Sequence, residues 1–143
     1  MNKSILIPAM IMGTFLSASD LQTQEMSTDA MAKQKTKIVK LASEEISKTL
    51  PQKIDNYTTL QRVEGKDNQL IYVYEINTGS KSDETVRKED KSRMKEAVTY
   101  GICRSSKRFL DAQIDIVYLY TSATSKSKLF EFVVKQEDCP TSN

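Results

Sequence analysis

The chain of 143 residues contains no histidine. The familiar serine and cysteine nucleophiles depend on a histidine base, so this absence excludes Ser-His-Asp and Cys-His catalysis. A metal site would also lack the ligand that most often accompanies cysteine at zinc. We therefore predict no metal site and no cofactor.

Glycine is scarce as well, and the net charge is small. The four glycines are isolated from one another, which excludes a glycine-rich phosphate-binding loop. The 21 Lys and Arg residues nearly balance the 19 Asp and Glu residues, for a formal charge of +2. Lysines cluster at positions 33, 35, 37 and 40, but Glu44 and Glu45 follow them, which is typical of a solvated helix face. We predict no nucleic-acid partner, because such a partner needs a broader basic face with groove-reading or stacking residues.

Only one long apolar run occurs, over residues 5–16 (ILIPAMIMGTFL). It is too short to span a bilayer, which takes about 20 apolar residues. Lys3 precedes the run and the small residues Ser17, Ala18 and Ser19 follow it, which is the order of a secretory signal peptide. We predict a signal peptide over residues 1–19, a flexible leader over 20–29 and one domain over 30–143. A buried N-terminal helix is the alternative for the apolar run.

The two cysteines, Cys103 and Cys139, lie far from this apolar run. The run therefore lacks the lipid-acceptor cysteine of a bacterial lipoprotein, so we expect no stable membrane anchor and a periplasmic or secreted location. An even cysteine count in an exported chain indicates a disulfide, here between Cys103 and Cys139. The two are too far apart in sequence for a CxxC redox pair.

The hydrophobic pattern predicts two helical regions and four strands. The first helix covers residues 28–50, capped by Thr28 or Asp29 and ended by Pro51. Strands are expected over residues 57–64, 69–77, 113–121 and 129–135, the first two joined by a turn at 65–68. The order α-β-β-α-β-β predicts an α+β domain, with a four-stranded antiparallel sheet and helices packed on one face.

The second helical region follows Ser82, which we expect to cap a helix. Its apolar stripe consists of Met94, Ala97, Val98, Gly101 and Ile102. Cys103 is out of phase with this stripe at about 100° per residue. We therefore expect the helix to break near Cys103 and to restart over residues 106–111, so that Cys103 can reach the end of the chain.

Matches to catalytic motifs are weak. Two S-x-x-K matches occur, at residues 92–95 and 125–128, but the partner motifs S-D-N and K-T-G are both missing. Two acidic pairs, at 89–90 and 137–138, consist of adjacent residues, whose side chains point apart in regular structure. We interpret the S-x-x-K matches as coincidence in a chain rich in Ser and Lys, expect solvated surface at the acidic pairs, and predict that the protein is not an enzyme.

Tyrosines recur at alternate positions of two predicted strands, namely Tyr72 and Tyr74, then Tyr118 and Tyr120. This alternation predicts that all four share one sheet face, with Phe130 and Phe132 nearby. An exposed cluster would be a partner-binding surface, because tyrosine is enriched at interfaces. The same rings could instead form core beneath the helices, which is the reading we favour in so small a domain.

Several short motifs together resemble a known family. They are Leu50-Pro51, Ile54-Asp55, Thr58-x-Leu60, Tyr72-x-Tyr74, Ile102-Cys103, Tyr118-x-Tyr120 and Asp138-Cys139. Over residues 37–139 they resemble a family of small secreted bacterial α+β proteins, largely uncharacterised. The layout is similar, more loosely, to the α/β pilotins of type II secretion, which bind a helix of the outer-membrane secretin.

The pilotin resemblance implies a cysteine on a helix and a second cysteine after the last strand, as Cys103 and Cys139 are placed here. The chain departs from the pilotins where their lipid-acceptor cysteine ends the signal. We predict an exported, non-catalytic protein-binding module whose partner is another protein. A pilotin-like partner of a secretin is one alternative, and a small hydrolase with Ser-Lys or carboxylate chemistry is the other.

Overall fold

A computed structural model describes residues 26–141 of the protein. The expected signal peptide lies outside these residues, as does most of the expected leader. Within the described part, no helix combines the length and the apolar character that crossing a bilayer requires.

The α+β class is confirmed, but the sheet differs from the prediction in two ways. The elements, in chain order, are α1 (Thr28–Ser47), β1 (Gln52–Lys53), β2 (Thr58–Lys66), β3 (Gln69–Ile76), α2 (Asp83–Lys88), α3 (Ser92–Ser105), α4 (Lys107–Asp111), β4 (Asp115–Ser122), β5 (Lys128–Val134) and a 3-10 turn, η1 (Gln136–Asp138). The sheet has five strands in the order β1-β2-β3-β4-β5, not four. It is mixed, not antiparallel, because β3 and β4 are parallel.

The connection between β3 and β4 explains the parallel pair. All three helices α2, α3 and α4 lie between these strands in the chain. A crossover of this length carries the chain back to the end of the sheet where β3 began, so β4 runs in the same direction as β3. The other pairs are antiparallel, namely β1 with β2, β2 with β3 in the predicted hairpin, and β4 with β5.

Helix α1 begins one residue earlier than the expected cap allows. Ser27, and neither Thr28 nor Asp29, is the N-cap, and its hydroxyl accepts a hydrogen bond from the Ala30 amide at 3.2 Å. The helix ends at Ser47, where the prediction had it continue to residue 50. Lys48 and Thr49 form a turn instead, so the helix ends before the residue that the proline restricts.

The β2–β3 hairpin is tighter than predicted, because Gly65 belongs to β2 and only Asp67 and Asn68 form the turn. At Gly65 a Cβ atom would lie 2.7 Å from Val39 Cγ1 and 2.9 Å from the Val39 carbonyl oxygen. Glycine in a strand allows such a close approach of another element. Gly65 therefore lets α1 lie directly on β2, with Val39 only 1% exposed.

The second helical region is divided twice. Ser82 caps α2, as predicted, and accepts from the Thr85 amide at 3.2 Å. The chain leaves the helix after Lys88 and enters α3 at Ser92, a break that the sequence pattern did not indicate. The break expected near Cys103 is confirmed, since α3 ends just beyond it and α4 follows.

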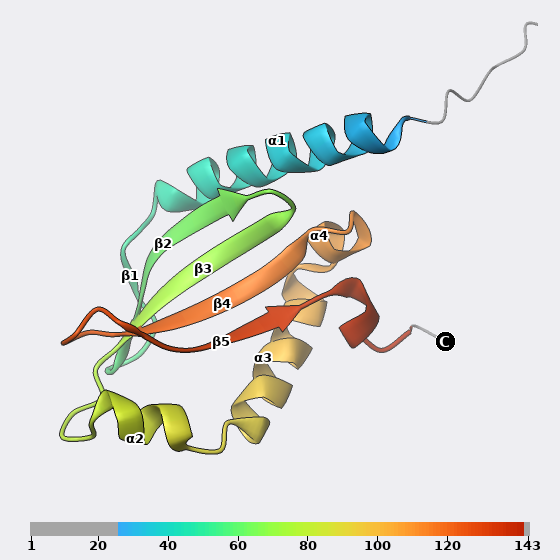
Figure 1. Ribbon diagram of the computed structural model, residues 1–143. Coiled ribbons are helices and arrows are strands. Elements are labelled where there is room, and N and C mark those ends of the chain that lie inside the picture. Colours follow the sequence, from blue (N-terminus) through green and yellow to red (C-terminus); the bar gives the residue numbers. More distant parts are fainter. Residues whose placement is uncertain (1–25, 142–143) are drawn as a thin grey trace, which may run out of the picture.

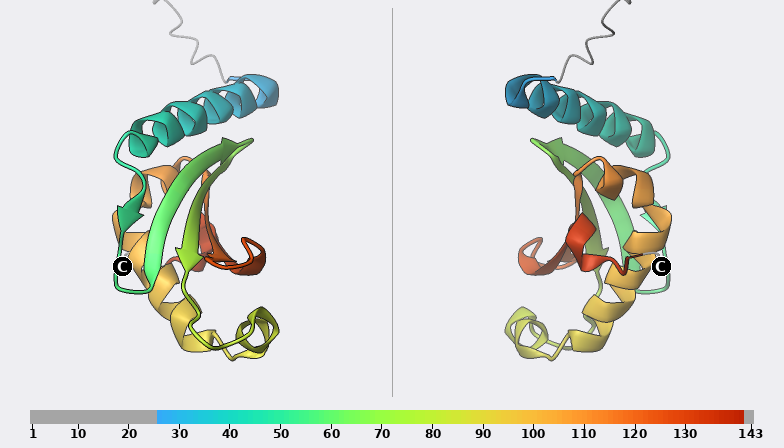
Figure 2. Two further views of the ribbon diagram at one scale, coloured as in Figure 1. Left: turned by 90° about the vertical axis from the view of Figure 1, so that its left-hand side faces the viewer. Right: turned by 90° about the vertical axis from the view of Figure 1, so that its right-hand side faces the viewer.

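The core lies between the sheet and the helices α1, α3 and α4 (Figures 1 and 2). Its buried members are Val39, Leu60, Val63, Leu70, Tyr74, Ile102, Leu110, Ile114, Ile116, Tyr120, Phe132 and Val134. Helix α1 packs mainly on β2, whereas α3 packs on β5 and α4 on β4. The helices thus cover the two sides of one sheet face and leave its middle between them.

Candidate functional site

The four tyrosines lie on one sheet face. The parallel register places Tyr72 opposite Tyr118 and Tyr74 opposite Tyr120. Their rings form a continuous row, with centroid distances of 5.3 Å from Tyr72 to Tyr118, 4.9 Å from Tyr118 to Tyr74 and 5.0 Å from Tyr74 to Tyr120. Phe130 extends the row, stacked 4.7 Å from Tyr120.

Burial divides the four tyrosines into two pairs. Tyr74 and Tyr120 are 8% and 5% exposed and belong to the core, as the favoured reading of the sequence had it. Tyr72 and Tyr118 pack against this core but remain partly exposed. Only the second pair is therefore placed to meet a partner.

The phenols of Tyr72, Tyr74 and Tyr120 are neutral at physiological pH, because their pKa values are raised. Burial, and to a smaller extent the neighbouring Tyr118, raises the pKa of Tyr72 to about 12. The same two causes raise the pKa of Tyr120 to about 12, and burial raises that of Tyr74 as well. The face offers uncharged aromatic surface with hydroxyl groups at its edge.

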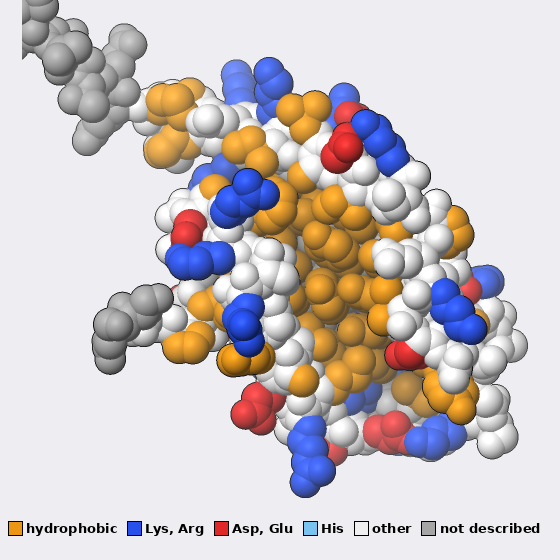
Figure 3. All heavy atoms as spheres, turned by 180° about the vertical axis from the view of Figure 1, so that it is seen from behind, with side chains coloured by type: hydrophobic (Ala, Val, Ile, Leu, Met, Phe, Trp, Pro, Cys, Tyr) orange, Lys and Arg blue, Asp and Glu red, His pale blue; other side chains and the backbone are white. Residues whose placement is uncertain are grey.

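An apolar hollow opens on the sheet face between α1 and α3 (Figure 3). We call it the tyrosine groove. We assign its floor to Tyr72 and Tyr118, and its walls and end to six further apolar residues that are likewise partly buried and packed against the core, namely Ala42, Ile46, Met94, Val98, Ile76 and Phe130. The groove is thus an apolar trough whose long sides are helices and whose base is the middle of the sheet.

Helix α1 turns one of its flanks toward the groove. Lys35, near its N-terminal end, donates a hydrogen bond at 2.8 Å to Gln113, in the turn before β4. At about 100° per residue, Ala42 and Ile46 lie on the same line of α1 as Lys35, and Ile38 lies slightly above it. Because Ile38 is 36% exposed, the apolar surface continues from the floor to the rim.

Helix α3 carries small residues on the side that faces the groove. Ile102 points into the core, and Cys103 lies about 100° round the helix from it, toward Cys139 beyond β5. Gly101 lies about 100° in the other direction, toward the groove, one turn after Ala97. Both small residues are exposed, and a Cβ atom at Gly101 would meet nothing within 4 Å. The sequence marked both as part of the apolar stripe, yet they border the open space.

At one end the groove leads into a cavity of about 540 Å³ beside α2. Ile76, Met94 and Phe130 line both the groove and this cavity. Lys91 closes the far side, where its Nζ donates to the carbonyl oxygens of Val86, Arg87 and Glu89 and lies 4.9 Å from the centroid of the Phe130 ring. This lysine fixes the end of α2 against the aromatic row.

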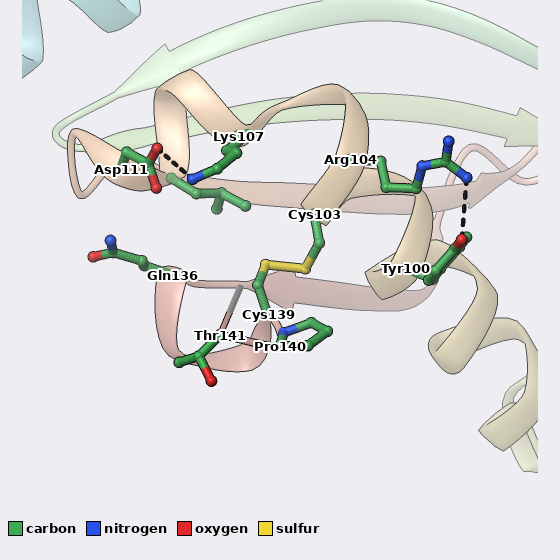
Figure 4. A pocket seen from close by; sticks show the side chains of 10 residues that line it. Tyr100, Cys103, Arg104, Lys107, Asp111, Gln136, Cys139, Pro140 and Thr141 are labelled. Carbon is green, nitrogen blue, oxygen red and sulfur yellow. Dashed lines mark hydrogen bonds and ion pairs between the residues drawn. A yellow bond between two sulfur atoms is a disulfide. The ribbon is translucent and has the colours of Figure 1, made fainter. Parts of the chain in front are cut away.

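The predicted disulfide joins Cys103 to Cys139, with Cα atoms 5.5 Å apart. It lies on the flank of α3 away from the groove, beside a second cavity of about 290 Å³ (Figure 4). The charged groups there bind one another: Arg104 donates to the Tyr100 hydroxyl at 3.1 Å and Lys107 pairs with Asp111 at 2.7 Å. This cavity is the weaker candidate for a site, because its charged side chains already have partners.

The weak catalytic motifs are not assembled into a site. The Ser125 hydroxyl donates to Asp83, whereas Lys128 pairs with Glu131 at 2.8 Å. The Ser92 hydroxyl donates to Asp90, and this bond holds the pKa of that carboxyl below its usual value. Among the described residues, no group of three or more His, Cys, Asp or Glu side chains could hold a metal ion.

Residues 33–130 match the family described as Domain of unknown function (DUF8479), which covers most of the chain. The chain belongs to the DUF8479 family. The family resemblance drawn from the sequence motifs is thereby confirmed. No curated protein matches this DUF8479 chain in sequence.

Solved structures similar to the DUF8479 chain share its fold. A predicted secreted protein from Pseudomonas aeruginosa is 15% identical with a TM-score of 0.69, over 77% of this chain and 96% of that one. The type II secretion pilotin EpsS from Vibrio vulnificus is 11% identical with a TM-score of 0.63, over 78% and 97% of the two chains. The pilotin AspS from Vibrio cholerae is 12% identical with a TM-score of 0.62, over 80% and 100%. At these identities the likeness shows the fold, and it confirms the pilotin resemblance at that level.

Proposed function

We propose that this DUF8479 protein is an exported, non-catalytic module that binds an apolar helical segment of another protein in the tyrosine groove. The observation that carries the proposal is the groove itself, an uncharged aromatic floor left open between two helices. Aromatic rings with a polar edge are typical anchors of protein interfaces.

The sheet favours a helix over an extended peptide as the occupant. An added strand needs a free sheet edge for its backbone hydrogen bonds. The floor strands β3 and β4 are each paired on both sides, so the groove offers side chains only. A helix satisfies its own backbone groups and needs only apolar contact. The small residues Ala97 and Gly101 let such a helix approach α3 closely.

Gly101→Gln is the sharpest test, because it is expected to fill the groove without harming the fold. Replacing a glycine inside a helix by a good helix former should raise the free energy of unfolding by about 0.5 to 1 kcal/mol. The same side chain would occupy the space that the partner needs. We expect affinity capture from a periplasmic extract to recover the partner with the wild-type protein and to lose it with Gly101→Gln.

Glu96→Gln is the matched control, since it places the same side chain on the opposite flank of α3, beside Cys103. It should leave capture unchanged. Tyr118→Ser, on the groove floor, should weaken capture as Gly101→Gln does, by more than about 1 kcal/mol if Tyr118 is an anchor. Equal capture by wild type, Gly101→Gln and Tyr118→Ser would show that the partner binds elsewhere.

A pilotin-like role is the second candidate. It is favoured by the two pilotin structures, whose chains are matched over 97% and 100% of their length. The resemblance implies a helix of an outer-membrane secretin as the occupant. The only two cysteines of this chain form the disulfide, so a role of this kind would proceed without lipid on a cysteine. Identification of a secretin in the captured fraction would support this candidate, and any other partner would contradict it.

Export rests on the sequence pattern of residues 1–19 and is supported by a protein of the same fold, from Pseudomonas aeruginosa, that is predicted to be secreted. Mass spectrometry of the protein from fractionated cells should find a chain that begins near residues 18–20 outside the cytoplasm. An intact species retaining Met1 in the cytoplasm would contradict export, whatever the outcome of the groove variants.

A further inference from the structure

The outer crest of α1 carries large apolar side chains that nothing covers in the described structure. Met31, Ile38 and Leu41 are 42%, 36% and 55% exposed. At about 100° per residue the three lie within an arc of about 80°. The N-terminal half of α1 extends past the end of β2 (Figure 1). Exposed apolar residues in a row on one helix indicate an interaction surface.

Lysines border this crest on both sides. On the same helical wheel, Lys37 lies about 40° beyond Leu41 and Lys35 about 40° beyond Met31 on the groove side, whereas Lys33 and Lys40 lie farther round, about 80° and 100° from Leu41. Asp29 is the sole acidic residue of α1 before Glu44. The first two thirds of α1 therefore combine an apolar crest with a local excess of positive charge, although the whole chain has a formal charge of only +2.

We propose that the crest of α1 docks on the surface of an anionic lipid bilayer. A helix with a narrow apolar face flanked by lysines lies in the plane of the interface, with the apolar side chains among the headgroups and the ammonium groups on anionic lipids. The positive charge of the lysines on α1 favours an anionic lipid surface over a second copy of this chain as the occupant. Two crests facing each other would bring like charges together, whereas an anionic surface neutralises them. With three apolar side chains the docking is shallow and reversible.

The test is co-sedimentation of the purified protein with vesicles of phosphatidylglycerol and phosphatidylcholine in equal parts, or of phosphatidylcholine alone. We expect binding to the anionic vesicles that weakens as salt is raised. Each lysine near an anionic surface contributes about fivefold in partitioning, so changing Lys33, Lys37 and Lys40 to Gln should weaken binding about a hundredfold. Leu41→Ser should weaken it about tenfold. Residues 1–25 are the same in all variants, so these differences report on α1.

A second triple variant, Lys81, Lys88 and Lys126 to Gln, removes the same charge from exposed sites around α2 and the β4–β5 loop. It should keep vesicle binding within about threefold of wild type, as should Gly101→Gln, which separates this surface from the groove. Equal losses in the two lysine triples, or equal binding to both kinds of vesicle, would overturn the proposal. So would a dimer in sedimentation velocity that Leu41→Ser dissociates, because a second copy would then cover the crest.

Discussion

Removing the disulfide by changing both Cys103 and Cys139 to Ser is expected to lower the free energy of unfolding by about 2 to 5 kcal/mol. The bond joins residues 36 apart in sequence. It fastens α3 to the segment that follows β5, where the three-residue turn η1 is the last regular element. Without it, the unfolded chain gains conformational freedom and the end of the chain loses its attachment to α3.

Urea unfolding followed by circular dichroism measures this loss. Adding a thiol reductant to the wild-type protein should reproduce it, and the same reductant should not affect the double variant. If the double variant unfolds at the same urea concentration as the wild type, the bond contributes nothing to stability, and its role would have to be sought elsewhere.

Tyr120→Ala is expected to lower the free energy of unfolding by about 3 to 5 kcal/mol, the range for removing a large aromatic side chain from a core. Tyr120 is 5% exposed and stacks between Tyr74 and Phe130, at centroid distances of 5.0 Å and 4.7 Å. The substitution leaves a cavity in the middle of the aromatic row, where the rigid sheet cannot close it.

Tyr57→Ala is the matched control for this prediction, because Tyr57 is 68% exposed. Its effect should stay within about 0.5 kcal/mol, as for most surface substitutions. Denaturant unfolding of the two variants measures both losses in the free energy of unfolding and so tests the prediction. Comparable losses in both would mean that burial in the row does not stabilise the fold, and a folded, stable Tyr120→Ala protein would return Tyr120 to the list of partner contacts.

The sequence indicated the helices, the long strands and the disulfide because each leaves a local pattern. The alternation of Tyr72, Tyr74, Tyr118 and Tyr120 was enough to place all four on one face. The strand β1 was missed because its two residues, Gln52 and Lys53, have no β-branched or aromatic character. The parallel pairing of β3 and β4 could have been predicted from the sequence, because a strand, a helical region and another strand in succession are typical of a crossover connection.

What the sequence could not show is where the helices leave the sheet open. Whether a tyrosine is core or groove floor depends on the lateral positions of α1 and α3, which no local pattern encodes. The two glycines Gly65 and Gly101 illustrate this limit. A Cβ atom at Gly65 would lie only 2.7 Å from Val39 Cγ1, whereas a Cβ atom at Gly101 would meet nothing within 4 Å. The same residue type marks a contact in one place and an opening in the other.

The crossover between β3 and β4 also governs when the groove comes into being as the chain folds. One wall is α1, from the start of the domain, and the other is α3, whose position depends on the pairing of β3 with β4 across the intervening helices. Contacts between residues so far apart in sequence are slow to form. The chain loses the conformational entropy of the long loop before the new contacts contribute any favourable free energy. Newly made chains would therefore acquire helix α1 and the β2–β3 hairpin before they acquire a complete groove. Under the proposed function, only chains that have finished folding would bind the partner. Chains whose groove is still incomplete would not.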